Sequence, residues 1–365
     1  MNIAFIGALT GIGGIQKVSA LIASELARQN TVCYIDYRGD DEFCFPLLNN
    51  VKVYNVASSE NKGRRMIVGD KIRSIYQQEI KSIIDIMSQN RVNVAFFAGS
   101  FCTTLIAEIK DRLPKIKMVA WQLNSFEQYM GRYSEKYRDE YLNGLVRADA
   151  VICLIEHDVL LFSEYNHHSV CISNPINIIN EHCAVENKQL LTIARIEIEH
   201  KGLDLLLEAF DLADVPEWTL SIVGDGNDMQ ILTEKVACLR KHNKVLLKGY
   251  LLGDKLLQEY KCSSVLIMTS RWEGFPLTLL DAMSFGLPIV STPITCSKEV
   301  LRDGEYGILS KSFNVNDIAE AIRTITGSLE LRQHYSAQSL KRVQDYTVEK
   351  IIPMWNKLLV ELYNE

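Results

Sequence analysis

The chain alternates short apolar runs with longer stretches in which apolar residues recur every three or four positions. The first run, NIAFIG, precedes the amphipathic stretch IQKVSALIASELARQ, which leads to a second run, TVCYID. Later runs are VNVAFFA, IKMVAWQ and DAVICLI, again with helical stretches between them. Short apolar runs predict buried strands, so this pattern favours a parallel sheet covered by helices.

The second half repeats the alternation from QLLTIA onward. Its predicted strands are WTLSIVG, KVLLKG, SVLIMTS and LPIVST, and its predicted helices are 202–213, 228–241, 254–261 and 276–285. Between the halves, Asn174-Pro175 and a polar stretch predict a linker near 172–188.

The length of 365 residues exceeds one ordinary core and favours two domains. We expect an α/β protein with Rossmann-like domains at 1–175 and 176–345. Apolar positions at helical spacing in the tail predict a final helix over 346–365, which we expect to pack back toward the first domain.

Composition changes the picture mainly by exclusion. No apolar run reaches the roughly 18–20 residues of a membrane helix, and the start of the chain enters the first strand with no basic lead. The nine cysteines are scattered without metal-ligand spacing, which is typical of reduced thiols, so we expect a cytoplasmic protein.

Charge is distributed unevenly along the chain. Residues 1–175 carry 19 basic and 19 acidic side chains, and residues 176–365 carry 20 basic and 26 acidic side chains. The net charge of −6 argues against nucleic-acid binding.

The first loop has the glycine spacing of a dehydrogenase, with Gly7, Gly11 and Gly13 after an apolar strand. Asp36, at the end of the next strand, is placed to take a ribose hydroxyl. A short-chain dehydrogenase also needs a Tyr and a Lys four residues apart, and the only such pair is 346–350, near the end of the chain. We therefore disfavour an oxidoreductase and interpret the loop as an anion site at a helix N-terminus.

Two cations in the second half predict a diphosphate site. Arg195 ends the first predicted strand and Lys201 begins the next predicted helix, where a lysine opposes the helix dipole. Two fixed cations can neutralise a diphosphate without a metal ion. Gly224 and Gly226 follow a strand, and they either let a nucleotide approach the backbone or form an ordinary turn.

The strongest signal is the segment TSRWEGFPLTLLDAMSFGLPIVST. Pro276 suits a first helical turn and Gly286 a helix end, so the backbone N–H groups of Gly274–Thr278 should point into the preceding loop. Glu273 and Asp281 lie eight residues apart, or about 12 Å along a helix. That separation is comparable with the span from a donor sugar to its nucleotide ribose, and an acid at each end would hold hydroxyl groups.

Together these motifs resemble the retaining family 4 glycosyltransferases of GT-B fold. The resemblance covers nearly the whole chain through the glycine loop 11–14, ARI…HKG, IVGDG and SRWEGFPLTLLDAM. It implies two Rossmann-like domains facing across a cleft, with the acceptor bound mainly by the first and the nucleotide-sugar by the second. It also implies transfer with retention of configuration, no metal ion and no cofactor.

The resemblance assigns roles to individual residues. Glu273 would contact donor-sugar hydroxyls, Arg195 and Lys201 the diphosphate, and Asp281 the ribose. We expect these first three to be catalytic. The donor-binding residues that we expect are Gly13, Gly14, Gly224, Gly226, Gly274, Phe275, Pro276, Leu277, Thr278 and Asp281.

The chain departs from the family pattern in three places. Asp281 stands where the family usually has Glu, so its ribose contact is direct, water-mediated or weakened. Five residues rather than four separate Arg195 from Lys201, which predicts a one-residue bulge. Many relatives carry a histidine in the first-domain loop where this chain reads Gln122-Leu123-Asn124, and Asn124 is our candidate near the anomeric carbon.

The acceptor side is predicted from the basic segment 60–82, which includes Arg64 and Arg65 beside apolar residues. This mixture suits a phosphorylated, lipid-linked glycan or the anionic cytoplasmic face of the inner membrane, although a solvated helix face is nearly as good an explanation. Four tyrosines at a spacing of four predict a stripe on one helix face that packs in the core, with sugar stacking as the minor alternative. They are Tyr129, Tyr133, Tyr137 and Tyr141.

We therefore expect a metal-independent hexosyltransferase of bacterial surface polysaccharide or lipopolysaccharide biosynthesis. Its partners would be a nucleotide-sugar, UDP-linked because that is frequent in the family, and a glycan acceptor. Two alternatives stay open: a GT-B nucleotide-sugar epimerase, which forms product without an acceptor, and a non-catalytic glycan-binding subunit.

Overall fold

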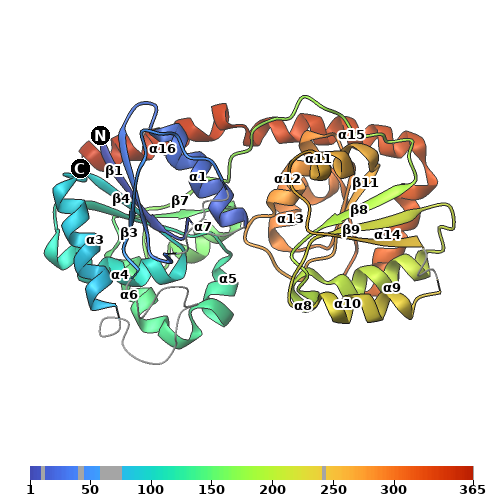
Figure 1. Cartoon of the computed structure of the whole chain (residues 1–365), viewed down its shortest axis with the longest axis horizontal. Coiled ribbons are helices and arrows are strands. Elements are labelled where there is room, and N and C mark those ends of the chain that lie inside the picture. Colours follow the sequence, from blue (N-terminus) through green and yellow to red (C-terminus); the bar gives the residue numbers. More distant parts are fainter. Residues whose placement is uncertain (10–12, 40–44, 58–75, 241–243, 365) are drawn as a thin grey trace. The chain divides into compact units, whose positions relative to one another are not determined.

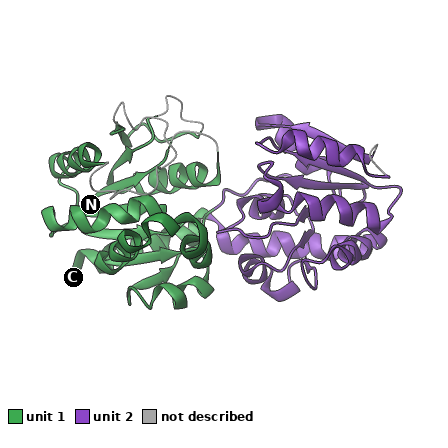
Figure 2. Cartoon of the chain, turned by 90° about the horizontal axis from the view of Figure 1, so that it is seen from below, with its two compact units in different colours: residues 1–175, 348–365 green, residues 176–347 purple. Residues whose placement is uncertain are grey.

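The computed structural model describes residues 1–9, 13–39, 45–57, 76–240 and 244–364. The chain divides into two compact units, residues 1–175 with 348–365 and residues 176–347 (Figure 2). Each unit has its own parallel sheet with helices packed against it (Figure 1). The chain is therefore α/β, as the alternating pattern predicts.

The sheet of the first unit has the order β3-β2-β1-β4-β5-β6-β7, in which the chain leaves the central β1 first to one side and then to the other. Its strands are β1 (Asn2–Gly7), β2 (Thr31–Asp36), β3 (Lys52–Asn55), β4 (Val94–Ala98), β5 (Lys117–Trp121), β6 (Ala150–Cys153) and β7 (Ser169–Cys171). Its helices include α1 (Gly14–Leu26), α3 (Gln77–Gln89), α4 (Gly99–Arg112), α6 (Arg138–Arg147), α7 (Glu156–Phe162) and α16 (Val348–Asn364). This is a Rossmann-like order, and it puts the carboxyl ends of β1 and β4 at the switch point.

The two faces of this sheet pack against different helices because side chains alternate along a strand. Ala4 and Ile6 of β1 belong to the core cluster that α3, α4 and α6 cover. Phe5, between them, belongs instead to an aromatic cluster with Phe96 and with Trp355 of the C-terminal helix α16. The tail helix thus completes the core of the first unit, although it follows the second unit in sequence.

Replacing Trp355 with alanine is expected to lower the free energy of unfolding by about 3–5 kcal/mol, because the side chain is fully buried and its loss leaves a cavity. Chemical denaturation followed by tryptophan fluorescence or circular dichroism would measure this loss. Met354→Ala is the matched control, since Met354 is 41% exposed on the same helix. Equal stability of the two variants would contradict the docking of α16.

The second unit has a parallel sheet in the order β10-β9-β8-β11-β12-β13. Its strands are β8 (Gln189–Ile193), β9 (Thr219–Val223), β10 (Val245–Gly249), β11 (Val265–Met268), β12 (Ile289–Ser291) and β13 (Ile308–Leu309). Its helices include α8 (Ile198–Lys201), α9 (Leu203–Ala213), α10 (Met229–Ala237), α11 (Gly253–Cys262), α12 (Leu277–Ser284), α13 (Thr295–Val300), α14 (Val315–Gly327) and α15 (Leu329–Arg342). The strand ends of β8 and β11 and the segments after them carry most of the predicted site residues.

Three helical segments differ from the sequence predictions. The tyrosine stripe does not lie on one helix: α5 (Phe126–Gln128), a π-helical turn (Tyr129–Tyr133), a 3₁₀ turn (Glu135–Tyr137) and α6 share that segment. Tyr129, Tyr137 and Tyr141 are nevertheless buried, as expected for core packing, whereas Tyr133 is 39% exposed. The predicted helix 228–241 ends early, because α10 closes at Ala237. The third difference is the short helix α8, which the sequence did not predict and which ends at Lys201.

Candidate active site

The segment after β8 carries the two predicted cations. Arg195 follows the strand and is half exposed, with its guanidinium 3.4 Å from the Glu197 carboxylate. Lys201 ends the four-residue helix α8 and lies directly before Gly202, the N-cap of the longer helix α9, so it stands close to the helix start that the sequence predicted. A lysine suits the last turn of α8 but opposes the dipole of α9, so the dipole by itself does not decide between an anion site and a structural role. The last three of the five residues between the cations belong to α8.

Gly202 lets α8 turn directly into α9. Its φ is +61°, and a Cβ there would lie 1.9 Å from the Thr269 carbonyl oxygen, so only glycine fits. The Thr269 hydroxyl donates to the carbonyl oxygens of Lys201 and Gly202, at 3.1 and 2.9 Å. The end of α8 is therefore held against the chain that leaves β11.

Glu273 lies in that same segment and forms an ion pair with Lys201. The Lys201 Nζ is 2.6 Å from Glu273 Oε1, and the Ser270 hydroxyl donates to the same oxygen at 2.7 Å. The two ionic side chains are only 17% and 13% exposed. Burial by itself would raise the pKa of Glu273, but the charges of Lys201 and His200 and the two hydrogen bonds outweigh it and lower that pKa. The structure thus brings together a cation and an acid that lie 72 residues apart.

His200 is a member of this cluster that sequence reasoning missed. Its ring stacks on the Trp272 ring, with centroids 4.8 Å apart and planes 4° apart. Its Nε2 lies 3.0 Å from the Trp272 carbonyl oxygen, and its Nδ1 lies 3.2 Å from Glu197. The available signal was its place in the HKG motif directly before Lys201, although a histidine at a helix surface rarely marks a site by itself.

Arg271 fixes the start of the acidic segment. Its guanidinium binds both oxygens of Asp204 on α9, at 2.9 and 2.7 Å, and its backbone N–H donates to the His200 carbonyl. Bidentate pairs of this kind define direction as well as distance. The Glu273 segment is therefore attached to both α8 and α9 before any ligand is considered.

The expected donor-binding residues after Glu273 form a turn and the start of α12. Gly274, Phe275 and Pro276 are buried, and Leu277 and Thr278 open the helix. Pro276 is the residue before the helix rather than part of its first turn. The ring of Phe275 packs at an angle on Tyr346, with centroids 5.7 Å apart, which gives it a role in the core.

The end of α12 agrees with the sequence pattern. Gly286 has φ +73°, its N–H donates to Met283, and the N–H of Leu287 donates to Ala282. These two bonds are the Schellman closure of a helix. Asp281 lies within α12 and is half buried.

The 12 Å estimate for the two acids does not hold as it was derived, because only part of the chain between Glu273 and Asp281 is helical. Asp281 is electrostatically coupled to Tyr260, whose pKa is raised mainly by burial and further by the Asp281 charge. The Asp281 charge is therefore close enough to α11 to act on the pKa of one of its tyrosines.

The glycines of the G-x-G turn have a packing role. A Cβ at Gly224, whose φ is +147°, would lie 1.8 Å from the Ala194 carbonyl oxygen. The Gly226 N–H donates to the side chain of Asp225. Close packing against the segment after β8 is thus a sufficient physical reason for Gly224, and a nucleotide contact stays a prediction.

The surroundings of Asp36 argue against the dehydrogenase hypothesis. Asp36 is buried, and its two oxygens accept from the backbone N–H groups of Leu9 and Gly39, at 2.9 and 3.1 Å. Both oxygens are thus committed to the fold and not presented to a ribose. Gly13 precedes α1 and Gly14 is its first residue. Gly11 lies outside the described residues.

The other candidate site residues of the first unit differ in their surroundings. Gln122 is fully buried and bonds to Thr103 and Tyr141, so it belongs to the core. Asn124 is half buried after β5, with its side-chain oxygen on the Ser125 N–H. The acceptor candidates Arg64 and Arg65 lie outside the described residues.

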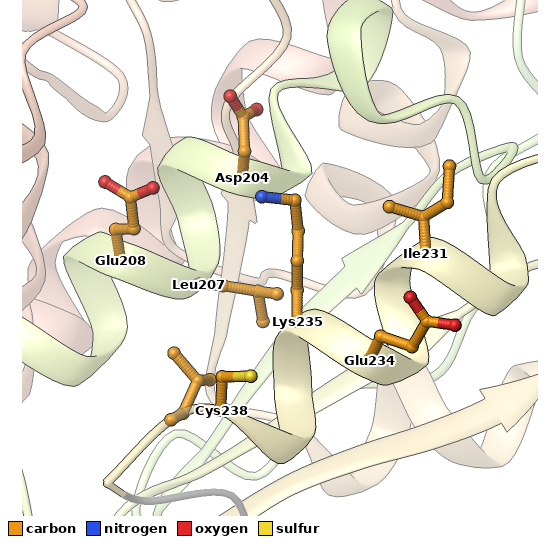
Figure 3. Close-up of a pocket in the computed structure, with 8 residues that line it drawn as sticks. Asp204, Leu207, Glu208, Ile231, Glu234, Lys235 and Cys238 are labelled. Atoms are coloured by element: carbon orange, nitrogen blue, oxygen red, sulfur yellow. The ribbon is translucent and has the colours of Figure 1, made fainter.

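A pocket of about 390 Å³ lies between α9 and α10 (Figure 3). Its lining includes Asp204, the partner of Arg271, with Glu208 and Lys235 also at its walls. Among the described residues, none of the expected donor or acceptor set lines it. Within the described residues there is also no group of side chains arranged to hold a metal ion, and no helix with the length and hydropathy to cross a bilayer.

Comparisons with known proteins agree with this architecture. Residues 177–342 match the family model "Glycosyl transferases group 1". An uncharacterized glycosyltransferase of Haemophilus influenzae is 26% identical over 97% of this chain and 98% of its own length. The amylovoran biosynthesis glycosyltransferase AmsD of Erwinia amylovora is 26% identical over 58% of this chain and 62% of its own. The structure of Anabaena Alr3699/HepE in complex with UDP has a TM-score of 0.81 at 16% identity, covering 99% of this chain and 100% of that one. This likeness confirms the expected GT-B fold.

Proposed function

Residues 177–342 are a glycosyl transferases group 1 domain, and from this premise we propose that the chain transfers a hexosyl group from a UDP-sugar to a glycan acceptor with retention of configuration. That the chain is a glycosyltransferase rests on this domain and on the full-length relative. The donor, the stereochemistry and the acceptor are our proposal. The observation that carries it is the largely shielded ion pair of Lys201 and Glu273, with the exposed Arg195 in the segment that leads to α8.

The pair suits a donor site because its two charges have different natural partners. In the proposed complex the Lys201 ammonium turns to the diphosphate, as does Arg195, which is already exposed. Glu273, kept ionised by its surroundings, accepts from hydroxyl groups of the sugar. The backbone N–H groups of Gly274–Thr278, among which Pro276 has none, and the contact of Asp281 with the ribose complete the proposed site.

The reaction needs no further group from the described residues. The acceptor oxygen forms a bond to the anomeric carbon on the face from which the diphosphate leaves, and the bond between that carbon and the phosphate oxygen breaks. The departing oxygen takes the acceptor proton, so the nucleoside diphosphate leaves with it. Arg195 and Lys201 stabilise the negative charge that develops on the leaving group, and we propose no metal ion.

The acceptor is proposed to be a saccharide or lipid-linked glycan of a bacterial surface polysaccharide or lipopolysaccharide. The name of the Erwinia relative, which refers to biosynthesis of the polysaccharide amylovoran, supports this class. Asn124, half buried in the segment after β5, is proposed near the anomeric carbon. Arg64 and Arg65 are proposed to contact a phosphorylated acceptor or the cytoplasmic face of the membrane.

A thermal-shift screen tests the donor. UDP is expected to raise the melting temperature more than GDP or ADP at equal concentration, because a ligand that binds only the folded state stabilises it. Lys201→Ala should remove most of the shift, and Lys311→Ala, on the exposed surface of the same unit, should retain it. A larger shift with GDP or ADP would replace uridine as the base, and no shift with any of them would contradict the site.

A further inference from the structure

His200 faces more acceptors than a neutral histidine can satisfy. Its Nε2 approaches the Trp272 carbonyl oxygen at 3.0 Å, and its Nδ1 approaches Glu197 Oε2 at 3.2 Å. Carbonyl and carboxylate oxygens only accept, whereas a neutral imidazole donates from one nitrogen. Both bonds therefore form together only when the ring is doubly protonated.

The charges around His200 oppose one another. Burial and the adjacent Lys201 ammonium lower the pKa of His200, while the carboxylates of Glu273 and Glu197 act to raise it. Glu273 Oε2 lies 3.9 Å from Nε2. Two further cations lie outside these contacts. Arg195 forms an ion pair with Glu197, and Arg271 forms one with Asp204. The ring thus sits where a small change in local charge alters its protonation.

The proposed donor chemistry supplies that change. When Lys201 turns from Glu273 to a diphosphate, its positive charge becomes neutralised by phosphate oxygens and Glu273 loses its closest cation. Both effects make the surroundings of His200 more negative. A proton on His200 then restores a cation next to Glu273 and completes the bonds to Trp272 and Glu197.

We propose that His200 is a positioning residue of the donor site, which holds Trp272 and Glu273 against α8 and takes up a proton when a nucleoside diphosphate binds. This role rests on the proposed function. The stacked Trp272 ring and the bond to its carbonyl connect His200 to the residue next to Glu273. The imidazole therefore controls both the direction of the carboxylate and the charge that faces it.

Calorimetric titration of the whole protein with UDP in two buffers of different ionisation enthalpy measures the protons exchanged on binding. The comparison is between the native protein, His200→Gln and His334→Gln. Gln retains one donor but cannot gain a proton in this range, and His334 is an exposed histidine of the same unit, on α15. Subtracting the number of protons exchanged by the variant from the number exchanged by the native protein removes any contribution from UDP itself.

The native protein and His334→Gln should take up more protons per UDP than His200→Gln, by a fraction of one proton. UDP affinity should also rise more steeply toward acid pH in the native protein. His200→Phe keeps an aromatic ring for stacking and should show the same loss of proton uptake as His200→Gln. This result would show that the uptake comes from titration of the imidazole and not from packing of the ring.

The possible failures are distinguishable. If His200→Gln and His200→Phe bind UDP with the same proton exchange as the native protein, His200 is only a structural residue and the inference is wrong. If the folded native protein binds none of UDP, GDP and ADP, the donor site itself is wrong, and this role of His200 falls with it.

Discussion

Replacing Glu273 with alanine is expected to lower the rate of sugar transfer by about 100- to 1,000-fold, the usual effect of removing one charged group that stabilises a transition state. The reason is geometric. Glu273 is held by Lys201 and Ser270 at one oxygen and backed by His200, so its carboxylate is oriented before the donor arrives. Hydrolysis of a UDP-sugar without acceptor measures the effect when the acceptor is unknown.

Two comparisons make this result specific. Glu305→Ala removes an exposed acid from the same unit and should leave the rate unchanged. Glu273→Gln keeps the shape and one acceptor oxygen, so its rate should lie between those of the alanine variant and the native protein. Full activity of Glu273→Ala would mean that the site is wrongly assigned. Interconversion of the sugar without transfer or hydrolysis would instead favour the epimerase. If the native protein shows no turnover, the non-catalytic subunit would be favoured.

Replacing Lys201 with alanine is expected to affect both stability and transfer. Its removal leaves a shielded carboxylate without its closest cation, which should cost about 1–3 kcal/mol of unfolding free energy, because the pair lies between the surface and fully buried cases. Transfer should fall by about 100-fold or more, since the ammonium group that would contact the diphosphate is lost. Denaturation and the hydrolysis assay measure the two effects, with Lys311→Ala as the control.

The ion pair of Lys201 and Glu273 also predicts how stability changes with pH. The folded state lowers the pKa of Glu273 below its ordinary value of 4.5, so the pair stabilises the fold above that pH. The contribution is lost as the pH falls through the lowered value. Lys201→Ala should reduce this acid-dependent part, and Lys201→Ala with Glu273→Gln should recover part of the stability that the single variant loses. Equal stability profiles of the native protein and Lys201→Ala would contradict the pairing.

Most strands were predictable because each is a continuous apolar run. NIAFIG and TVCYID coincide with β1 and β2, since strands covered by helices on both faces need apolar side chains in both directions. The short helix α8 and the broken tyrosine segment were missed for a related reason. Pieces of three to five residues gain little from their own periodicity, and their conformation depends on contacts such as Thr269 on Gly202.

Part of the site was predictable in the same way. Glu273 and Gly286 lie within one local pattern of loop, helix and helix end, and the structure keeps the helix end where the pattern placed it. Asp36 shows the limit, because its position after a strand suggested a ribose contact while its oxygens hold two backbone amides. A side chain's residue type says what it can bind, and its neighbours decide what it does bind.

By itself the sequence determined the two alternating α/β halves and the candidate cations and acids, because periodicity and residue chemistry are local properties. Only the tertiary structure decided that Lys201 pairs with Glu273 and that His200 stacks on Trp272, since β8 and β11 are neighbours in the sheet though far apart in the chain. Parallel strands bring their carboxyl ends to one edge, and the contacts made there have no counterpart in the order of the residues.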